Sequence, residues 1–133
     1  MLLVDLENLS FAGTDHLSTE EVEDRLARVI ESAGPVEYAL AVAPRSSIAR
    51  HGAALARLGL RWVESPTGPD AADHRIVALA AELAPLGYDE FVIASGDHYF
   101  VALAKLGHLT VIAPTGQPVS RELASACAQL IAA

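Results

Sequence analysis

Short apolar runs alternate with amphipathic stretches along the whole chain. The apolar runs have the length of strands that are buried on both faces, and several are rich in Val and Ile. Between them, apolar residues recur at the spacing of a helix with one face against a core. The pattern predicts strands over residues 2–5, 36–42, 60–64, 88–95 and 109–113. It predicts helices over residues 18–32, 46–58, 70–83, 98–106 and 119–131.

Local start and stop signals support these helices. Ser18-Thr19-Glu20-Glu21 forms a capping box at the start of the first helix, and Gly34-Pro35 ends it. Gly59 is the expected stop of the second helix. Asp70 is interpreted as the N-cap of the third helix rather than as a ligand.

This alternation predicts the fold class. Strand–helix units with short connections favour an α/β fold, a three-layer α/β/α sandwich with a mainly parallel five-stranded sheet. Residues 1–133 show no repeat, low-complexity tract or linker, so we expect a single domain. In such folds, ligands bind beyond the carboxyl ends of the strands.

Composition narrows the class of protein further. Hydrophobic residues make up 52% of the 133 residues, which excludes a disordered chain. No apolar run approaches the roughly 18 residues of a membrane helix, and the start of the chain resembles a strand rather than a signal peptide. The single Cys127 excludes an internal disulfide and a cysteine zinc cluster. We expect a cytoplasmic protein without membrane association.

The net charge of −8 also restricts the function. A protein that coats nucleic acid regardless of sequence is normally basic, so this charge argues against that role. It does not exclude a nuclease, because bound cations offset acidic residues locally.

Three carboxylates occupy positions where chemistry is expected. Asp5 ends the first apolar run, Asp97 follows the fourth, and Asp73 opens the third helix. In a parallel α/β domain all three lie at the same edge of the sheet. Carboxylates that converge there repel one another unless a cation lies between them. A purely carboxylate site suits Mg²⁺ or Mn²⁺.

Each acid also has a structural alternative. Asp5 could accept hydrogen bonds from turn N–H groups, and Asp97 could be an N-cap. An acid such as Asp73 also suits a first helical turn. Asp73, however, shares a stripe with Ile76 and Ala80, which faces the sheet, so its carboxylate needs a partner there.

Neighbouring residues add candidate support to this centre. Glu7 and Asn8 follow Asp5 and offer an acid and an amide, although Asn8 could equally be a turn residue. Ser95 could orient a carboxylate or a phosphate, or act only as a cap. Gly96 would let the backbone approach a ligand closely.

Basic residues form a candidate rim. Arg45 and Ser46 follow the second strand and offer a guanidinium, a hydroxyl and a helix N-terminus to phosphate. Arg121 repeats this arrangement after the fifth strand. Each alone is a routine surface arginine, but together they would suit a phosphodiester around an acidic centre.

Three segments together resemble the NYN domains, a branch of the PIN-like ribonucleases. The segments are Val4–Leu9 (VDLENL), Gly68–Asp73 (GPDAAD) and Phe91–Phe100 (FVIASGDHYF). The resemblance covers nearly the whole chain and is strongest to small single-domain bacterial members. It implies a PIN-like sheet in the order 3-2-1-4-5 and acidic residues that hold a divalent metal for RNA phosphodiester hydrolysis.

By matching position, the metal-binding and catalytic acids would be Asp5, Asp73 and Asp97, with Asn8 and Ser95 in support. Many members carry a further aspartate two residues after that of the Ser-Gly-Asp motif, where this chain has Tyr99. Loss of a fourth acid lowers the affinity for cations and favours a module with weak or no catalysis.

The hypothesis from sequence is therefore a metal-dependent endoribonuclease that uses Mg²⁺ or Mn²⁺ and acts on RNA. The alternative is a catalytically weak or inactive PIN-like module that binds RNA, a second copy of itself or another protein. A phospho-acceptor receiver domain would need an acid after the third strand and a lysine after the fifth, and neither is present. No Gly-x-Gly-x-x-Gly motif follows the first strand, which argues against a dinucleotide site.

Overall fold

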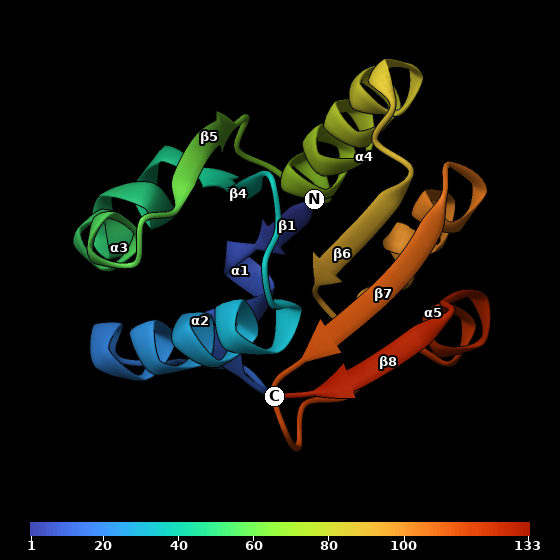
Figure 1. The fold of residues 1–133 in the computed structure, drawn as a ribbon. Coiled ribbons are helices and arrows are strands. Elements are labelled where there is room, and N and C mark those ends of the chain that lie inside the picture. Colours follow the sequence, from blue (N-terminus) through green and yellow to red (C-terminus); the bar gives the residue numbers. More distant parts are fainter.

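One parallel sheet organises the chain (Figure 1). The computed structural model describes residues 1–133. Its sheet strands are β1 (Leu2–Asp5), β4 (Ala39–Pro44), β5 (Arg61–Ser65), β6 (Glu90–Ala94), β7 (His108–Ala113) and β8 (Gln129–Ala132). They lie in the order β5-β4-β1-β6-β7-β8, and every neighbouring pair is parallel.

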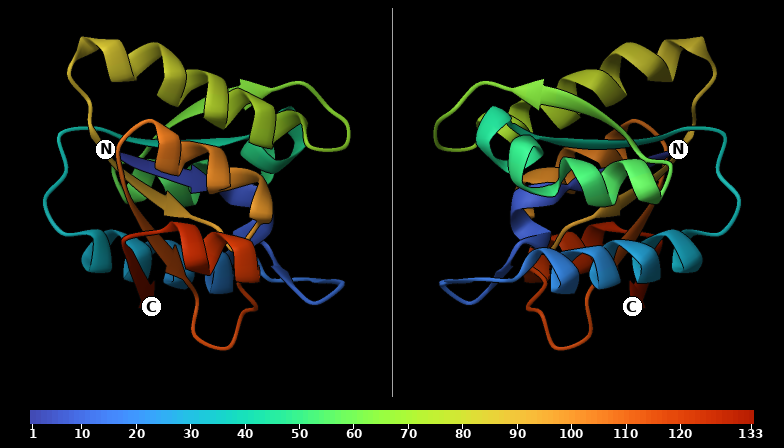
Figure 2. Two further views of the ribbon diagram at one scale, coloured as in Figure 1. Left: turned by 90° about the vertical axis from the view of Figure 1, so that its right-hand side faces the viewer. Right: turned by 90° about the vertical axis from the view of Figure 1, so that its left-hand side faces the viewer.

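Helices cover both faces of this sheet. One face carries α1 (Leu6–Leu9), α2 (Thr19–Ala33) and α3 (Arg45–Arg57), whose apolar residues form one core cluster. The other face carries α4 (Ala71–Leu83), the 3₁₀ helix η2 (His98–Lys105) and α5 (Arg121–Ala126), which form a second cluster. Figure 2 shows α4 and α2 on opposite sides of the strands, which confirms the three-layer α/β/α class. No helix has both the length and the apolar character needed to cross a bilayer.

The alternation of side chains along β1 divides these two clusters. Leu2 and Val4 point to the α2 and α3 face, whereas Leu3 belongs to the cluster beneath α4. Because side chains alternate along a strand, Asp5 points to the same face as Leu3. The last residue of this buried strand is therefore a carboxylate directed toward the α4 layer.

The sheet order of the five predicted strands, 3-2-1-4-5, is confirmed, but a five-stranded sheet is wrong. The chain has a sixth strand, β8, where the pattern predicted the second half of a helix over residues 119–131. Helix α5 ends at Ala126, and the N–H group of Ala128 then donates to the carbonyl of Leu109 over 2.8 Å. Without β8, the edge of β7 would have unpaired backbone N–H and C=O groups. Pairing of residues 129–132 with this edge therefore outweighs their helical sequence pattern.

Two smaller elements also differ from the sequence prediction. The helix predicted over residues 98–106 is present as the 3₁₀ helix η2 rather than as an α-helix. After α1, a short hairpin joins β2 (Phe11–Ala12) to β3 (Asp15–His16). Gly13 in its turn has a φ of 64°, a conformation that glycine adopts without strain. A last 3₁₀ turn, η1 (Ala84–Leu86), connects α4 to β6.

Candidate functional site

The three predicted acids line one cavity at the carboxyl ends of the strands. Asp5 comes from the end of β1, Asp73 from the first turn of α4 and Asp97 from the loop after β6. The cavity has a volume of about 350 Å³. Its other polar walls are Glu7, Asn8 and Asp70.

Asp5 is the most buried acid of this cavity. Its residue exposure is 4%, and the hydroxyl of Ser95 donates to its Oδ2 over 2.9 Å. Burial, followed by repulsion from Asp73, raises the pKa of Asp5 to about 7, although the hydrogen bond from Ser95 opposes the shift. Ser95 thus has the orienting role toward a carboxylate that the sequence suggested, and it is itself fully buried.

Asp73 faces the sheet, as the stripe on α4 predicted. It is 8% exposed, and Ile76 and Ala80 on the same face of the helix are fully buried. Burial raises the pKa of Asp73 to about 6, with further contributions from the charges of Asp97 and Asp70. The positive end of the α4 dipole offsets only part of this cost.

Asp70 occupies the N-cap position of α4 in an unexpected way. It is the N-cap residue of α4, as predicted, but its side chain makes no capping hydrogen bond. It is the one residue other than glycine with a positive φ, 57°. Asp70 lines the cavity beside Asp73, where its charge contributes to the raised pKa of Asp73.

Asp97 is both an N-cap and a wall of the cavity. Its Oδ1 accepts from the N–H of Tyr99 over 2.9 Å, which caps η2. The same oxygen lies 3.3 Å from Nδ1 of His98. The capping alternative for Asp97 is therefore present, but it engages Oδ1 and leaves Oδ2 for a further partner.

Asn8 is held by a network that sequence reasoning missed. The Asn8 Oδ1 accepts from the Gly96 N–H over 3.3 Å and from Nε2 of Gln117 over 2.8 Å. Gln117 is in turn bound by Nη1 of Arg25 over 2.9 Å, and the same Arg25 nitrogen donates to the carbonyl of Phe11. Asn8 thereby links the segment after β1 to the loops after β6 and β7.

Gly96 serves a different purpose from the one expected. A Cβ atom at this position would lie 2.4 Å from the carbonyl oxygen of Pro118 and 3.2 Å from Cα of Val119. The Gly96 carbonyl also accepts from the Ser120 N–H over 2.8 Å. The backbone that approaches Gly96 is therefore that of the protein itself.

Tyr99, which stands where many NYN domains carry a further aspartate, contacts His74 in the first turn of α4. Its hydroxyl hydrogen-bonds with the ring of His74, and the two rings meet edge to face with centroids 4.9 Å apart. Burial and the charges of Asp70 and Asp73 raise the pKa of Tyr99, so the phenol stays protonated. Tyr99 supplies a hydroxyl where another carboxylate would supply charge.

Of the predicted basic rim, only Ser46 lies close to the acidic cavity. Ser46 lines a small cavity that adjoins the acidic one. Arg45 and Arg121 are exposed at the starts of α3 and α5, and neither lines either cavity. Their role as phosphate contacts remains a prediction.

The donor set is that of a hard cation, but the side chains do not form a closed metal site. No three His, Cys, Asp or Glu side chains are close enough together to enclose an ion. Mg²⁺ does not require such a cage, because it usually keeps several waters and binds one or two carboxylates together with substrate phosphates. The carboxylates of Asp5, Asp73 and Asp97 around one open cavity fit that mode of binding.

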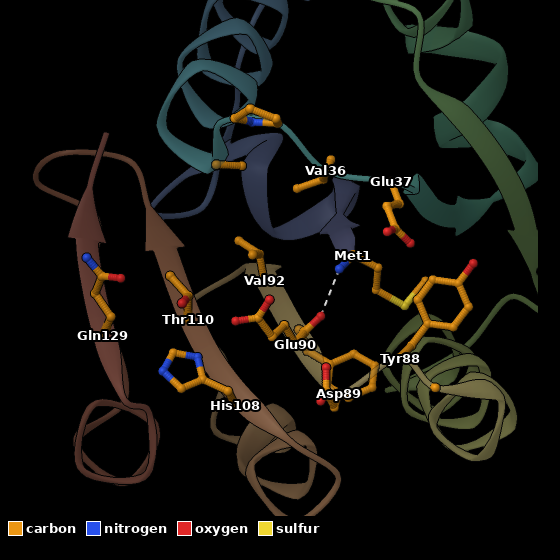
Figure 3. A pocket seen from close by; sticks show the side chains of 14 residues that line it. Met1, Val36, Glu37, Tyr88, Asp89, Glu90, Val92, His108, Thr110 and Gln129 are labelled. Atoms are coloured by element: carbon orange, nitrogen blue, oxygen red, sulfur yellow. Dashed lines mark hydrogen bonds between the residues drawn. The ribbon is translucent and has the colours of Figure 1, made fainter.

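A second cavity, larger than the acidic one, lies elsewhere. It has a volume of about 470 Å³, opens at the amino ends of the strands and shares no residue with the acidic cavity (Figure 3). Its walls include Glu37, Asp89 and Glu90, and the Met1 amino group donates to the Glu90 carbonyl over 2.8 Å. Because it lies away from the clustered acids, size alone does not identify it as the functional site.

Comparisons with known proteins agree with this architecture. The model of the NYN domain family matches residues 1–132. The structure is similar to the crystal structure of a protein of unknown function from Vibrio parahaemolyticus, with a TM-score of 0.70 and 20% identity over 98% of this chain and 90% of that chain. At that identity, the likeness shows the fold alone. No curated protein sequence matches the chain.

Proposed function

The chain belongs to the NYN domain family, and from that premise we propose that it is a metal-dependent ribonuclease. The NYN match indicates a PIN-like nuclease fold. The finer proposal is that Asp5, Asp73 and Asp97 hold Mg²⁺ or Mn²⁺ and that RNA phosphodiester bonds are hydrolysed there.

One observation carries the proposal. Asp5 and Asp73 are buried beside other carboxylates without a salt bridge, and their pKa values are raised to about 7 and about 6. Such burial of an ionised carboxylate destabilises a fold, because neither acid is paired with a cationic side chain. A divalent cation would supply the missing positive charge. A purely structural role for these acids does not account for this cost.

The residues of the chain have distinct roles in this proposal. A bound divalent metal would polarise the phosphate and lower the pKa of an attacking water. Asp5, oriented by the Ser95 hydroxyl, and Asp73 would hold the cation from two layers of the fold. Asp97 would contribute Oδ2 while Oδ1 remains in the η2 cap. Because metal binding requires the ionised carboxylates, it should release protons at neutral pH.

The remaining polar residues around the centre would bind or orient. Asn8 is fixed by the hydrogen bonds from Gly96 and Gln117, so its amide can contact substrate without reorganisation. Glu7 lines the cavity and adds charge beside Asp73. Arg45 and Arg121 would meet more distant phosphates of an RNA strand.

A second candidate function is a PIN-like module that binds RNA or protein without cleaving it. Tyr99 favours it, because this residue places a protonated phenol where a further acid would strengthen cation binding. The two candidates differ in turnover rather than in fold.

The deciding experiment is Mn²⁺-dependent cleavage of end-labelled RNA. The wild-type protein should cleave with Mn²⁺ and not with EDTA, and Asp97→Asn should lose cleavage. Asp24→Asn, which removes an exposed acid on α2, is the matched control and should cleave like the wild type. Binding of Mn²⁺ and RNA without cleavage by the wild type would refute the nuclease and favour the second candidate.

A further inference from the structure

We propose that the small cavity beside the acidic site is a phosphate-binding subsite, which holds a phosphate next to the scissile one on the same strand. Its assignment to RNA rests on the proposed function, whereas its affinity for phosphate does not. The cavity has a volume of about 100 Å³ and shares Glu7 and Phe11 with the acidic cavity. A chain that crosses both cavities would place successive phosphates in them.

An unpartnered histidine marks this cavity. His51, on the inner face of α3, is 2% exposed and lines the cavity. Its Nδ1 is the one buried side-chain nitrogen or oxygen in the chain without a hydrogen-bond partner. Buried polar groups in folded proteins are almost always paired, so an unpaired one needs an explanation. A bound ligand that pairs with the imidazole would provide it.

The groups around His51 select an anion as that ligand. Arg50 lines the same cavity, and its Nη1 lies 3.3 Å from Nδ1 of His16 on the hairpin. Burial, the charge of Arg50 and then that of His16 lower the pKa of His51, so the surroundings of the ring are already positive. Glu7 is the one acid in the lining and lies at the boundary with the acidic cavity.

The start of α3 adds further donors. This helix spans 13 residues, and its N-cap, Pro44, has no side chain that could accept from the first-turn N–H groups. Ser46 and Ser47 carry hydroxyls in that first turn and line the cavity. A free helix N-terminus together with hydroxyls, a guanidinium and an imidazole matches the oxygens of a phosphate group.

The binding experiment uses inorganic phosphate as the probe and needs no cleavage. The side-chain nitrogens of His51 are followed by ¹⁵N NMR while phosphate is added to the protein in EDTA. They should shift in the wild type and stay unchanged in Arg50→Gln. Arg28→Gln, which removes an exposed arginine of α2, is the control and should behave like the wild type. No shift of His51 at saturating phosphate, or a shift that survives Arg50→Gln, would overturn the subsite.

A second variant separates binding from folding. His51→Leu fills the space of the ring with an apolar side chain and removes the unpaired nitrogen. Its thermal midpoint should therefore equal or exceed that of the wild type. It should nevertheless lose the phosphate-dependent rise in midpoint that the wild type shows. A phosphate response retained by His51→Leu would contradict the subsite.

The RNA experiment tells this inference apart from the proposed function. In Mn²⁺-dependent cleavage, Arg50→Gln should raise KM about tenfold with little change in kcat, and the slope of log affinity against log salt should fall by about 0.7. If RNA is cleaved and neither quantity changes, the subsite is wrong and the nuclease stands. If phosphate binds through His51 and Arg50 but no RNA is cleaved, the subsite stands and the nuclease fails.

Discussion

The raised pKa of Asp5 predicts that the metal-free protein loses stability as the pH rises. The pKa of this carboxyl is about 7 in the folded protein against 3.8 in the reference state. Between these values the folded chain retains a proton that the unfolded chain releases. The slope of unfolding free energy against pH is therefore negative, and the stabilisation is lost as the pH passes the folded pKa. Asp5→Asn removes this titration and keeps an oxygen that can accept from Ser95.

The size of the effect follows from the shift. The folded pKa of Asp5 is about 7, so pH 5.5 lies about 1.5 units below it and the folded carboxyl is protonated there. At pH 8 the folded carboxyl is almost fully ionised. At 1.36 kcal/mol per unit, the wild type should lose about 2 kcal/mol more than Asp5→Asn between these two pH values. Acids away from the cavity titrate equally in both proteins, so they cancel in this comparison, whereas Asp73 is coupled to Asp5 and should titrate at a lower pH once that charge is removed.

Urea unfolding in EDTA, followed by far-ultraviolet circular dichroism at pH 5.5, 6.5, 7.5 and 8, measures this difference. Asp24→Asn should follow the wild type at every pH, because it removes an exposed acid away from the cavity. Parallel curves for the wild type and Asp5→Asn, or an Asp5→Asn variant that loses stability faster as the pH rises, would refute the reasoning.

The other predictions concern the metal, the network and the rim. Millimolar Mn²⁺ should raise the thermal midpoint of the wild type more at pH 8 than at pH 5.5, because it competes with protons; equal shifts would contradict this. Asp97→Asn should keep the η2 cap, raise the metal-free midpoint and shrink the Mn²⁺ shift in the same melts, whereas a marked fall would mean that Asp97 is only structural. Gln117→Leu should cost about 1–2 kcal/mol in urea unfolding by removing a donor to Asn8. Arg45→Ala and Arg121→Ala should each lower the salt slope of RNA binding, measured by fluorescence anisotropy, by about 0.7 and change stability by about 0.5 kcal/mol or less.

The sheet and the placement of the three acids around one cavity could be predicted because both follow from regular patterns. Buried apolar runs with short helical connections leave few topologies, and the order of the first five strands follows the family resemblance. Asp5 and Asp97 lie directly after two such runs, and Asp73 belongs to a buried helical stripe. Their placement around one cavity therefore required only strand ends and helix periodicity.

The elements that were missed depend on contacts between distant segments. The segment Gln129–Ala132 is too short to distinguish a strand from the end of a helix by periodicity, and the free edge of β7 decides its conformation. Arg25 and Gln117 lie in stretches with no motif, and their bond is visible only when α2 and the loop after β7 are adjacent. His51 lies on an apolar helix face, where its sequence position resembles that of an ordinary core residue.

The tight packing at Gly96 has a consequence for how this family can diverge. Because the Pro118 carbonyl fills the space of a Cβ atom, any larger residue at this position must displace the loop that carries Gln117. The glycine of the Ser-Gly-Asp motif is thus required by the chain path and not by the chemistry. Relatives that exchange the three acids should still keep this glycine, so its presence reports the path of the chain and not the chemistry of the cavity.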